Sequence, residues 1–222
     1  IWDRETLARI GALCKQYDVI VVSDEIHCDL TKPGTEYIPF ASVDDTCRDI
    51  SVTCIAPTKT FNLAGLQTAA VYAENSILHH RMWRQLNTDE VAEPNAFAIQ
   101  AAIAAFQYGE EWLDELREYV EKNKQYVTEF LQEKIPLIHP VAGDATYLMW
   151  LDCRKITESG RQFVKFIRKT SGLYVSGGNQ YGRGGEGFLR VNVATSKLVV
   201  EDGMQRLYES VDAWLKEEKI SK

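Results

Sequence analysis

The sequence has few cysteines, and they are scattered. There are five in 222 residues, an odd number, and no two of them form a C-x-x-C pair: Cys14, Cys28, Cys47, Cys54 and Cys153. This pattern fits neither a disulfide framework nor a zinc site. We therefore expect reduced thiols and no bound metal.

Long apolar runs and an excess of basic residues are also missing. No stretch approaches the roughly 18 apolar residues that span a bilayer, and the opening residues IWDRETLARI lack the layout of a secretory signal. The net charge is −7, from 32 acidic and 25 basic residues, which argues against nucleic acid as a partner. We expect a cytoplasmic protein.

The first half of the chain alternates helical and strand-like segments. Apolar residues recur at helical spacing from Leu7 to Tyr17, and DVIVVSDEI then forms a short β-branched run. Two further strands are predicted at 49–55 and 68–73, and two helices at 76–86 and 96–108. Strands with near-continuous Val, Ile and Ala indicate a mainly parallel sheet with helices on both faces.

The second half has a different texture. A long charged helix is predicted from Glu110 to about Glu133, followed by strands at ATYLMWLDC and GFLRVNVA and helices at 161–170 and 199–217. We predict a first domain at 1–125, which includes the start of the connecting helix, and a small α+β domain at 126–222.

One glycine pattern resembles a nucleotide-binding fingerprint. Gly182, Gly184 and Gly187 satisfy G-x-G-x-x-G, but that fingerprint indicates dinucleotide binding only when it follows a strand and opens a helix. Here it leads into the strand FLRVNVA, so the pattern favours a flexible glycine turn.

Asp24 and Lys59 each follow a predicted strand. Asp24 comes directly after VIVVS, and ligands bind at the carboxyl ends of strands in open α/β sheets. An aspartate there also often caps the following turn, and a lone lysine is normally a solvated surface charge. If the two strands are neighbours, however, Asp24 and Lys59 share one edge of the sheet.

That pair suits a particular chemistry. A desolvated lysine amine is a nucleophile toward carbonyls, and pyridoxal phosphate uses such a Schiff base together with a carboxylate partner for its ring nitrogen. A guanidinium fork suits the carboxylate of an amino-acid substrate. Arg190, inside the otherwise apolar FLRVNVA, is the candidate; the alternative is a strand arginine with its head in water.

The stretches SDEIH, APTKTFNLAGLQ and GFLRVNVA, in this order, resemble the fold-type I pyridoxal-phosphate enzymes of aminotransferase class I/II. Within them they resemble the MalY/PatB branch of cystathionine β-lyases, or C–S lyases. The resemblance implies that Lys59 forms the Schiff base, that Asp24 pairs with the ring nitrogen and that Arg190 holds the substrate carboxylate. His27 stands where typical aminotransferases carry a tyrosine that contacts the cofactor's phenolic oxygen, and this favours the lyase branch.

The resemblance extends to two further candidates and shows two departures. Thr58 matches a serine that commonly touches the cofactor phosphate, and Tyr147 belongs to a strand that lines the substrate mouth in the family. Many relatives have a hydroxyl at the position of Ala56 and an arginine at the position of Gln67. This segment therefore offers few groups that could bind the cofactor phosphate.

The resemblance also implies a fold and an assembly. It corresponds to the back part of the large domain of a pyridoxal-phosphate transferase, a mainly parallel sheet with helices on both faces, plus an α+β C-terminal small domain. A glycine turn, a stacking aromatic and an N-P-x-N-P-like segment precede the first helix in the family but not here. We therefore expect the C-terminal portion of such an enzyme, weak or inactive alone, and a homodimer for the full-length protein.

The function expected from the resemblance is β-elimination from cystathionine or another cysteine S-conjugate, giving a thiol, pyruvate and ammonia. Two alternatives remain open. One is a class I/II aminotransferase, which uses the same residues, and the other is a non-catalytic fragment or regulatory binding partner.

Overall fold

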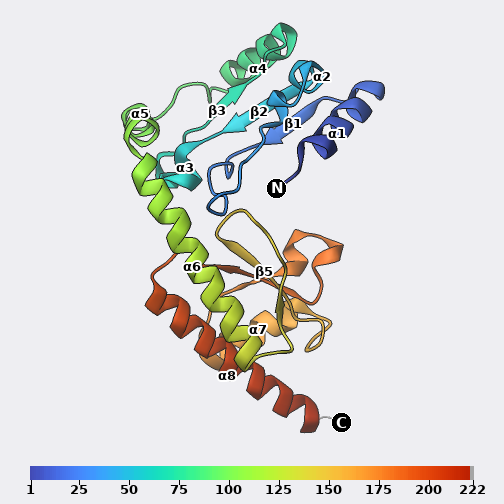
Figure 1. The fold of residues 1–222 in the computed structure, drawn as a ribbon, viewed down its shortest axis with the longest axis vertical. Coiled ribbons are helices and arrows are strands. Elements are labelled where there is room, and N and C mark those ends of the chain that lie inside the picture. Colours follow the sequence, from blue (N-terminus) through green and yellow to red (C-terminus); the bar gives the residue numbers. More distant parts are fainter. Residues whose placement is uncertain (221–222) are drawn as a thin grey trace. The chain divides into compact units, whose positions relative to one another are not determined.

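The computed structural model describes residues 1–220, and they form two compact units (Figure 1). The first unit is Ile1–Arg117 with Asp144–Thr146, and the second is Glu118–Gly143 with Tyr147–Lys222. The division falls within the long helix α6 (Glu110–Lys134). The functional domains at 1–125 and 126–222 stay a prediction, and the last two residues of the second lie outside the described residues.

The first unit contains most of the predicted elements of the first half. In chain order they are α1 (Arg4–Gln16), β1 (Val21–Asp24), η1 (Phe40–Ser42), α2 (Asp45–Asp49), β2 (Ser51–Ile55), α3 (Pro57–Thr60), η2 (Ala64–Leu66), β3 (Ala70–Tyr72), α4 (Ser76–Thr88), α5 (Ala98–Tyr108) and the start of α6.

Side-chain caps determine where several helices begin. The Asp3 carboxylate accepts the Thr6 N–H at 2.7 Å at the start of α1, and the Asn75 side chain accepts the N–H groups of Ile77 and Leu78 at the start of α4. These bonds satisfy donors that have no partner inside the helix. The hydrogen bonds to Thr6 also lower the pKa of Asp3.

The sheet of this unit has the order β1-β2-β3. β1 and β2 are parallel, with Asp24 opposite Cys54, whereas β3 runs antiparallel to β2. The predicted α/β class is confirmed, but the third strand departs from a parallel sheet. A parallel return usually runs through an α-helix that packs on the sheet, whereas the connection at 56–69 contains only the four-residue α3 and the three-residue η2.

One face of this sheet is covered. Leu7 of α1, Phe40 of η1 and Cys47 of α2 form a buried cluster against which Val21 packs. On the opposite face Val22 is 67% exposed and Val71 37% exposed. The sequence predicted helices on both faces, and the elements of this buried cluster, α1, η1 and α2, lie on one of them.

The second unit has the α+β composition that the sequence predicted. After α6 come β4 (His139–Pro140), β5 (Leu148–Asp152), α7 (Gly160–Ser171), β6 (Ser176–Gly177), η3 (Gly178–Tyr181), η4 (Arg183–Gly185), β7 (Phe188–Asn192) and α8 (Lys197–Ile220). The sheet order is β4-β5-β7-β6, with every neighbouring pair antiparallel.

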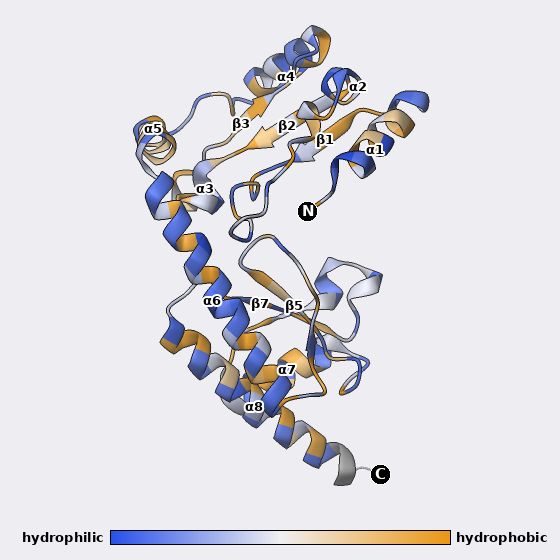
Figure 2. Ribbon diagram, viewed as in Figure 1, coloured by the Kyte–Doolittle hydropathy of each residue, from blue (hydrophilic) through white to orange (hydrophobic). Residues whose placement is uncertain are grey.

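Burial alternates along the two central strands of this sheet. Met149 and Leu151 of β5 and Leu189 and Val191 of β7 are buried, while Trp150 and the other intervening residues are partly exposed. Such alternation is typical of an antiparallel sheet with one face on the core. α7 packs against β6, β7 and α8, and the apolar stripes of the helices are visible in Figure 2.

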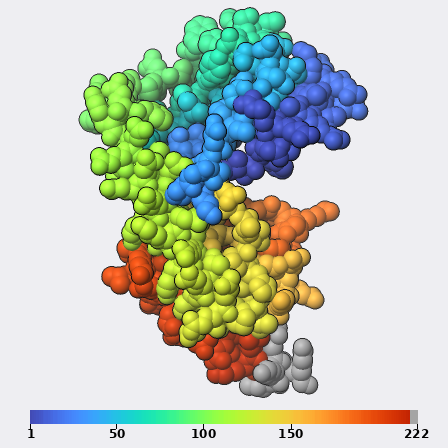
Figure 3. Space-filling model, in the orientation of Figure 1, coloured from blue at the N-terminus to red at the C-terminus, as the bar shows by residue number. Residues whose placement is uncertain are grey.

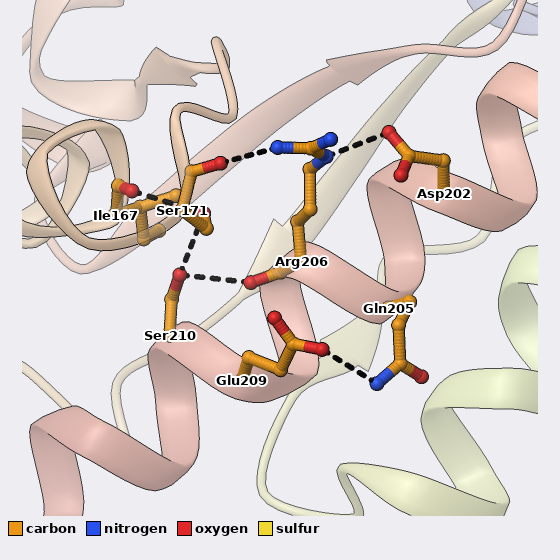
Figure 4. Close-up of polar contacts among 7 residues, drawn as sticks. All are labelled: Ile167, Ser171, Asp202, Gln205, Arg206, Glu209 and Ser210. Atoms are coloured by element: carbon orange, nitrogen blue, oxygen red, sulfur yellow. Dashed lines mark hydrogen bonds and ion pairs between the residues drawn. The ribbon is translucent and has the colours of Figure 1, made fainter.

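Polar contacts fix the end of α7 on α8 (Figure 4). Arg206 donates to the Ser171 carbonyl at 2.6 Å and pairs with Asp202 at 2.6 Å. The hydroxyl of Ser210, which is fully buried, bonds to the Ser171 hydroxyl at 2.9 Å. Gly172, with φ of +74°, closes the helix in the left-handed conformation that favours glycine.

Candidate functional site

Lys59 lies in a short helix immediately after a strand. β2 ends at Ile55, Ala56 is extended, and Pro57 occupies the first position of α3, where a missing N–H costs nothing. Lys59 is half-buried. The next residue, Thr60, is fully buried and donates its hydroxyl to Oδ2 of Asp29 at 3.0 Å.

Asp24 is the last residue of β1 and begins a turn. Its Oδ1 accepts the Ile26 N–H at 3.3 Å, which is the turn-capping role that short acidic residues often have. Its other oxygen, Oδ2, receives no hydrogen bond from any group that the structure describes. One carboxylate can therefore shape the turn and still accept a hydrogen bond from a ligand.

The parallel pairing of β1 and β2 brings these segments to one edge. Asp24 is opposite Cys54, and the Glu25 N–H donates to the Cys54 carbonyl at 2.8 Å. Because the strands are parallel, the turn after Asp24 and the helix with Lys59 both leave the sheet at its carboxyl edge.

The charges of Lys59 and Asp24 both act on His27. It is half-buried, and burial lowers its pKa; the positive charge of Lys59 lowers the pKa further, while Asp24 opposes this. His27 is therefore near enough to both charged groups for each to change its pKa. Asp24, His27 and Lys59 form one cluster at the sheet edge.

Glu25, which follows Asp24, is a buried carboxylate that connects this edge to η1. Glu25 is 4% exposed, and its Oε1 accepts the Ser23 hydroxyl at 2.8 Å and the Phe40 N–H at 3.1 Å. Burial and the neighbouring Glu25 raise the pKa of Tyr37 to about 12. Burial and Asp29 raise the pKa of Cys28 to about 12, so this thiol stays protonated at neutral pH and is not a nucleophile.

The remaining residues of the lysine segment have different surroundings. Thr58 is half-buried, and its hydroxyl makes no hydrogen bond to a described residue. Ala56 is 7% exposed. Gln67 ends η2 on the surface with φ of +50°. Of these three, only Thr58 offers a free hydroxyl beside Lys59.

Arg190 lies in the second unit, on β7 opposite Trp150. Its guanidinium carbon is 4.5 Å from the centroid of the Tyr181 ring, and the guanidinium has no hydrogen bond or ion pair with the described side chains, those of residues 1–217. An unpaired guanidinium that is only partly exposed is suited to an anion.

Tyr147 directly precedes β5 rather than lying in it as predicted, and its carbonyl accepts the Val193 N–H at 2.9 Å. Burial raises the pKa of Tyr147, and the Arg190 charge opposes that rise. Arg190 is therefore near enough to affect Tyr147 electrostatically, and their shared substrate role stays a prediction.

Three further residues stand beside the predicted ones and were not identified from the sequence. Asp29 and Thr60 join the two motifs of the first unit, and Tyr181 contacts Arg190. The signal for the first pair was their place in SDEIHCD and TKT, next to His27 and Lys59. Tyr181 had no signal, because its glycine-rich surroundings were interpreted as a flexible turn.

Comparison with known proteins identifies the family. A family model described as aminotransferase class I and II matches residues 1–207. The chain belongs to this family.

Relatives with names that give an activity or a cofactor include a lyase and a protein that contains pyridoxal phosphate. The chain is 41% identical over 206 residues to cystathionine beta-lyase PatB of Bacillus subtilis, covering 93% of this chain and 53% of PatB. It is similar in structure to cystalysin of Treponema denticola, which contains pyridoxal 5'-phosphate, with a TM-score of 0.92, 27% identity and coverage of 96% and 54%.

A third relative is the pyridoxal-phosphate-bound C–S lyase of Staphylococcus hominis, with a TM-score of 0.84, 32% identity and coverage of 95% and 54%. The chain thus spans about half the length of the relatives it matches.

Grouped metal ligands are absent from the described part of the chain, where no three His, Cys, Asp or Glu side chains are placed so as to hold a metal ion. None of the described helices has the length and hydropathy of a membrane span.

Proposed function

We propose that this chain contributes the lysine-bearing part of a pyridoxal-phosphate-dependent C–S β-lyase. The observation that carries the proposal is the cluster of Asp24, His27 and Lys59 at one sheet edge, in a chain 41% identical to a cystathionine beta-lyase over 206 residues. Its substrates would be cystathionine or other cysteine S-conjugates.

The residues of the cluster fit the cofactor. Lys59 offers a half-buried amine for the aldehyde. Among the described side chains, Asp24 Oδ2 and the Thr58 hydroxyl have no partner, so they are available for the ring nitrogen and the phosphate. His27 would contact the phenolic oxygen. When bound, pyridoxal phosphate supplies an electron sink for the carbanion formed at the substrate α-carbon.

Each residue then has a defined task. Asp24, as a carboxylate, keeps a proton on the ring nitrogen through its Oδ2. Arg190 binds the substrate carboxylate with its unpaired guanidinium, and Tyr147 lines that site. With the cofactor bound, the Lys59 amine would remove the α-proton as general base. The Cβ–S bond would then break, the sulfur would leave as a thiol after taking up a proton, and addition of water to the remaining three-carbon fragment would give pyruvate and ammonia.

The assembly and location are part of the same proposal. We propose a homodimer for the whole protein, which acts in the cytoplasm on a small amino acid and binds neither nucleic acid nor membranes. The net charge of −7 supports the absence of a nucleic-acid partner.

The first experiment tests the cofactor. Pyridoxal phosphate is added to the chain, the visible absorbance is recorded, the bond is reduced with borohydride, and the labelled lysine is mapped by mass spectrometry. The label should fall on Lys59, and Lys59→Ala should abolish the absorbance. Lys122→Ala, on the exposed face of α6, is the matched control. Equal labelling of Lys59→Ala and the control would remove Lys59 from the proposal.

The second experiment tests the reaction in the whole protein. Release of pyruvate and thiol from cystathionine is compared with amination of an added keto acid. Elimination should dominate. If amination were faster, the protein would be an aminotransferase of the same family that uses the same residues.

A further inference from the structure

The glycine-rich segment of the second unit is tightly folded where it lies under the surface. Gly178 and Gly185 are both buried, and a Cβ on either one would collide with the carbonyl of the other. A Cβ on Gly178 would also come within 2.9 Å of the Trp150 ring. The segment is therefore a closed loop whose two sides touch, and only glycine fits at the contact.

This loop presents Tyr181. The residue is the last of η3, between the two buried glycines, and is 48% exposed. Its ring meets Trp150 edge-on at 5.7 Å and lies 4.5 Å from the guanidinium carbon of Arg190. One side chain from the loop thus contacts both members of the β5–β7 pair Trp150 and Arg190.

A second arginine of the same unit, in the turn that follows β5, provides a contrast. Arg154 lies 4.9 Å from the Phe188 ring centroid, and it also forms a two-point ion pair with Asp152, at 2.9 and 2.6 Å. Arg190 has a ring contact of the same kind but no carboxylate among the described residues. Its position relative to its ring is therefore held without use of its hydrogen-bond donors.

We propose that Tyr181 is a positioning residue for Arg190, and that the glycine-rich loop exists to place this ring. Attraction between a guanidinium and a ring uses charge rather than N–H donors. The five donors of Arg190 thus stay free, while its side chain loses rotational freedom before a ligand arrives. A prepositioned fork binds a carboxylate more tightly than a mobile one. The inference rests on the proposed function through the role of Arg190.

The test is a titration of the chain with sodium propanoate, a carboxylate without an amine, monitored by NMR at the Arg190 side-chain N–H. Sodium chloride at equal ionic strength corrects for screening. Tyr181→Leu and Tyr181→Met should each weaken propanoate binding about five-fold, as expected for loss of one cation–π contact. Tyr181→Phe, which keeps the ring, should stay within about two-fold. In the whole protein the leucine variant should raise KM with little change in kcat.

Tyr174→Leu is the matched control, because Tyr174 covers Arg168 at 4.8 Å in the same unit; it should leave propanoate binding unchanged. Propanoate affinities of both Tyr181→Leu and Tyr181→Met equal to that of the unaltered chain would overturn the role of Tyr181. Arg190→Lys separates the two claims; for this variant and the unaltered chain, propanoate binding is followed at the Tyr181 ring signals, since the ring lies at residue 190. If Arg190→Lys binds propanoate as the unaltered chain does, the carboxylate role of Arg190 in the proposed function fails instead.

Discussion

The Thr60 hydroxyl donates a hydrogen bond of 3.0 Å to Oδ2 of Asp29. Thr60 follows Lys59 in α3, and Asp29 ends the turn that contains His27. The bond therefore joins the two segments whose side chains form the cluster at the sheet edge. Neither partner needs to touch a ligand for the bond to set the distance between Lys59 and His27.

Thr60→Val should loosen this junction. Valine keeps the shape but removes the donor, and loss of a hydrogen bond to a charged group costs about 1.5–3 kcal/mol. We expect a fall of that size in the free energy of unfolding, measured with urea on the cofactor-free chain, and weaker retention of pyridoxal phosphate. Thr60→Ser should restore both.

Thr88→Val is the matched control for the Thr60 variant. The Thr88 hydroxyl bonds only within its own helix, to the Arg84 carbonyl at 2.9 Å on the surface. If Thr60→Val lost no more stability than Thr88→Val and held the cofactor normally, the junction would have no part in the site.

His27 should make stability depend on pH. Burial and Lys59 lower its pKa below the ordinary value of 6.5, so the unfolded chain binds this proton more readily than the folded chain. The folded state is therefore penalised as the pH falls below about 6.5 toward the lowered pKa, and the penalty is absent above that value. Urea unfolding at pH 7.5, 6.5 and 5.5 should show a smaller loss on acidification for His27→Gln than for the unaltered chain.

The control for this pH experiment is His79→Gln, which replaces a histidine at an exposed position of α4. Equal loss of stability on acidification in His27→Gln and in the unaltered chain would show that His27 does not carry the effect.

The sequence predicted the sheet edge well, for a physical reason. Hydrophobic runs identify buried strands, and the carboxyl end of each strand follows from chain direction alone. The placement of Asp24 and Lys59 then depended only on the two strands being parallel neighbours, which they are.

What the sequence could not provide were contacts set by folding between distant segments. The antiparallel direction of β3 depends on how the short helices after β2 turn the chain. The ring of Tyr181 over Arg190 depends on the contact of Gly178 with Gly185. Local sequence patterns do not indicate contacts between residues that folding brings together. The glycine pattern alone therefore predicts a flexible loop.

Asn123 should be essential to the second unit. It is 3% exposed on α6, and its side-chain amide donates to the carbonyls of Val193 and Thr195 at 2.9 and 3.0 Å, directly after β7. Asn123→Leu would leave both carbonyls without this donor. Thr195 is exposed, so water can replace the amide there, but Val193 is buried, and an unsatisfied carbonyl costs about 1–3 kcal/mol. Urea unfolding should show a loss in that range.

Asn87→Leu is the surface comparison for this change, since Asn87 bonds only to the Trp83 carbonyl within its own helix. A loss in Asn123→Leu no larger than in Asn87→Leu would mean that water replaces the amide and that the end of β7 does not depend on Asn123.

Gly178→Ala and Gly184→Ala form a pair that tests whether the glycine-rich loop is a closed structure. Both glycines lie in the same loop, but a Cβ on Gly178 would collide with the Gly185 carbonyl and press on Trp150, whereas a Cβ on Gly184 would meet nothing within 4 Å. We expect Gly178→Ala to lower the free energy of unfolding by about 1–3 kcal/mol, as overpacking does, and to change the fluorescence of the chain through Trp150. Gly184→Ala should leave both unchanged.

Because alanine restricts the unfolded chain equally in the two variants, a difference in stability between them reports on the folded loop itself. Equal stability and equal fluorescence of the two variants would mean that the loop opens freely and does not hold Tyr181 in one place.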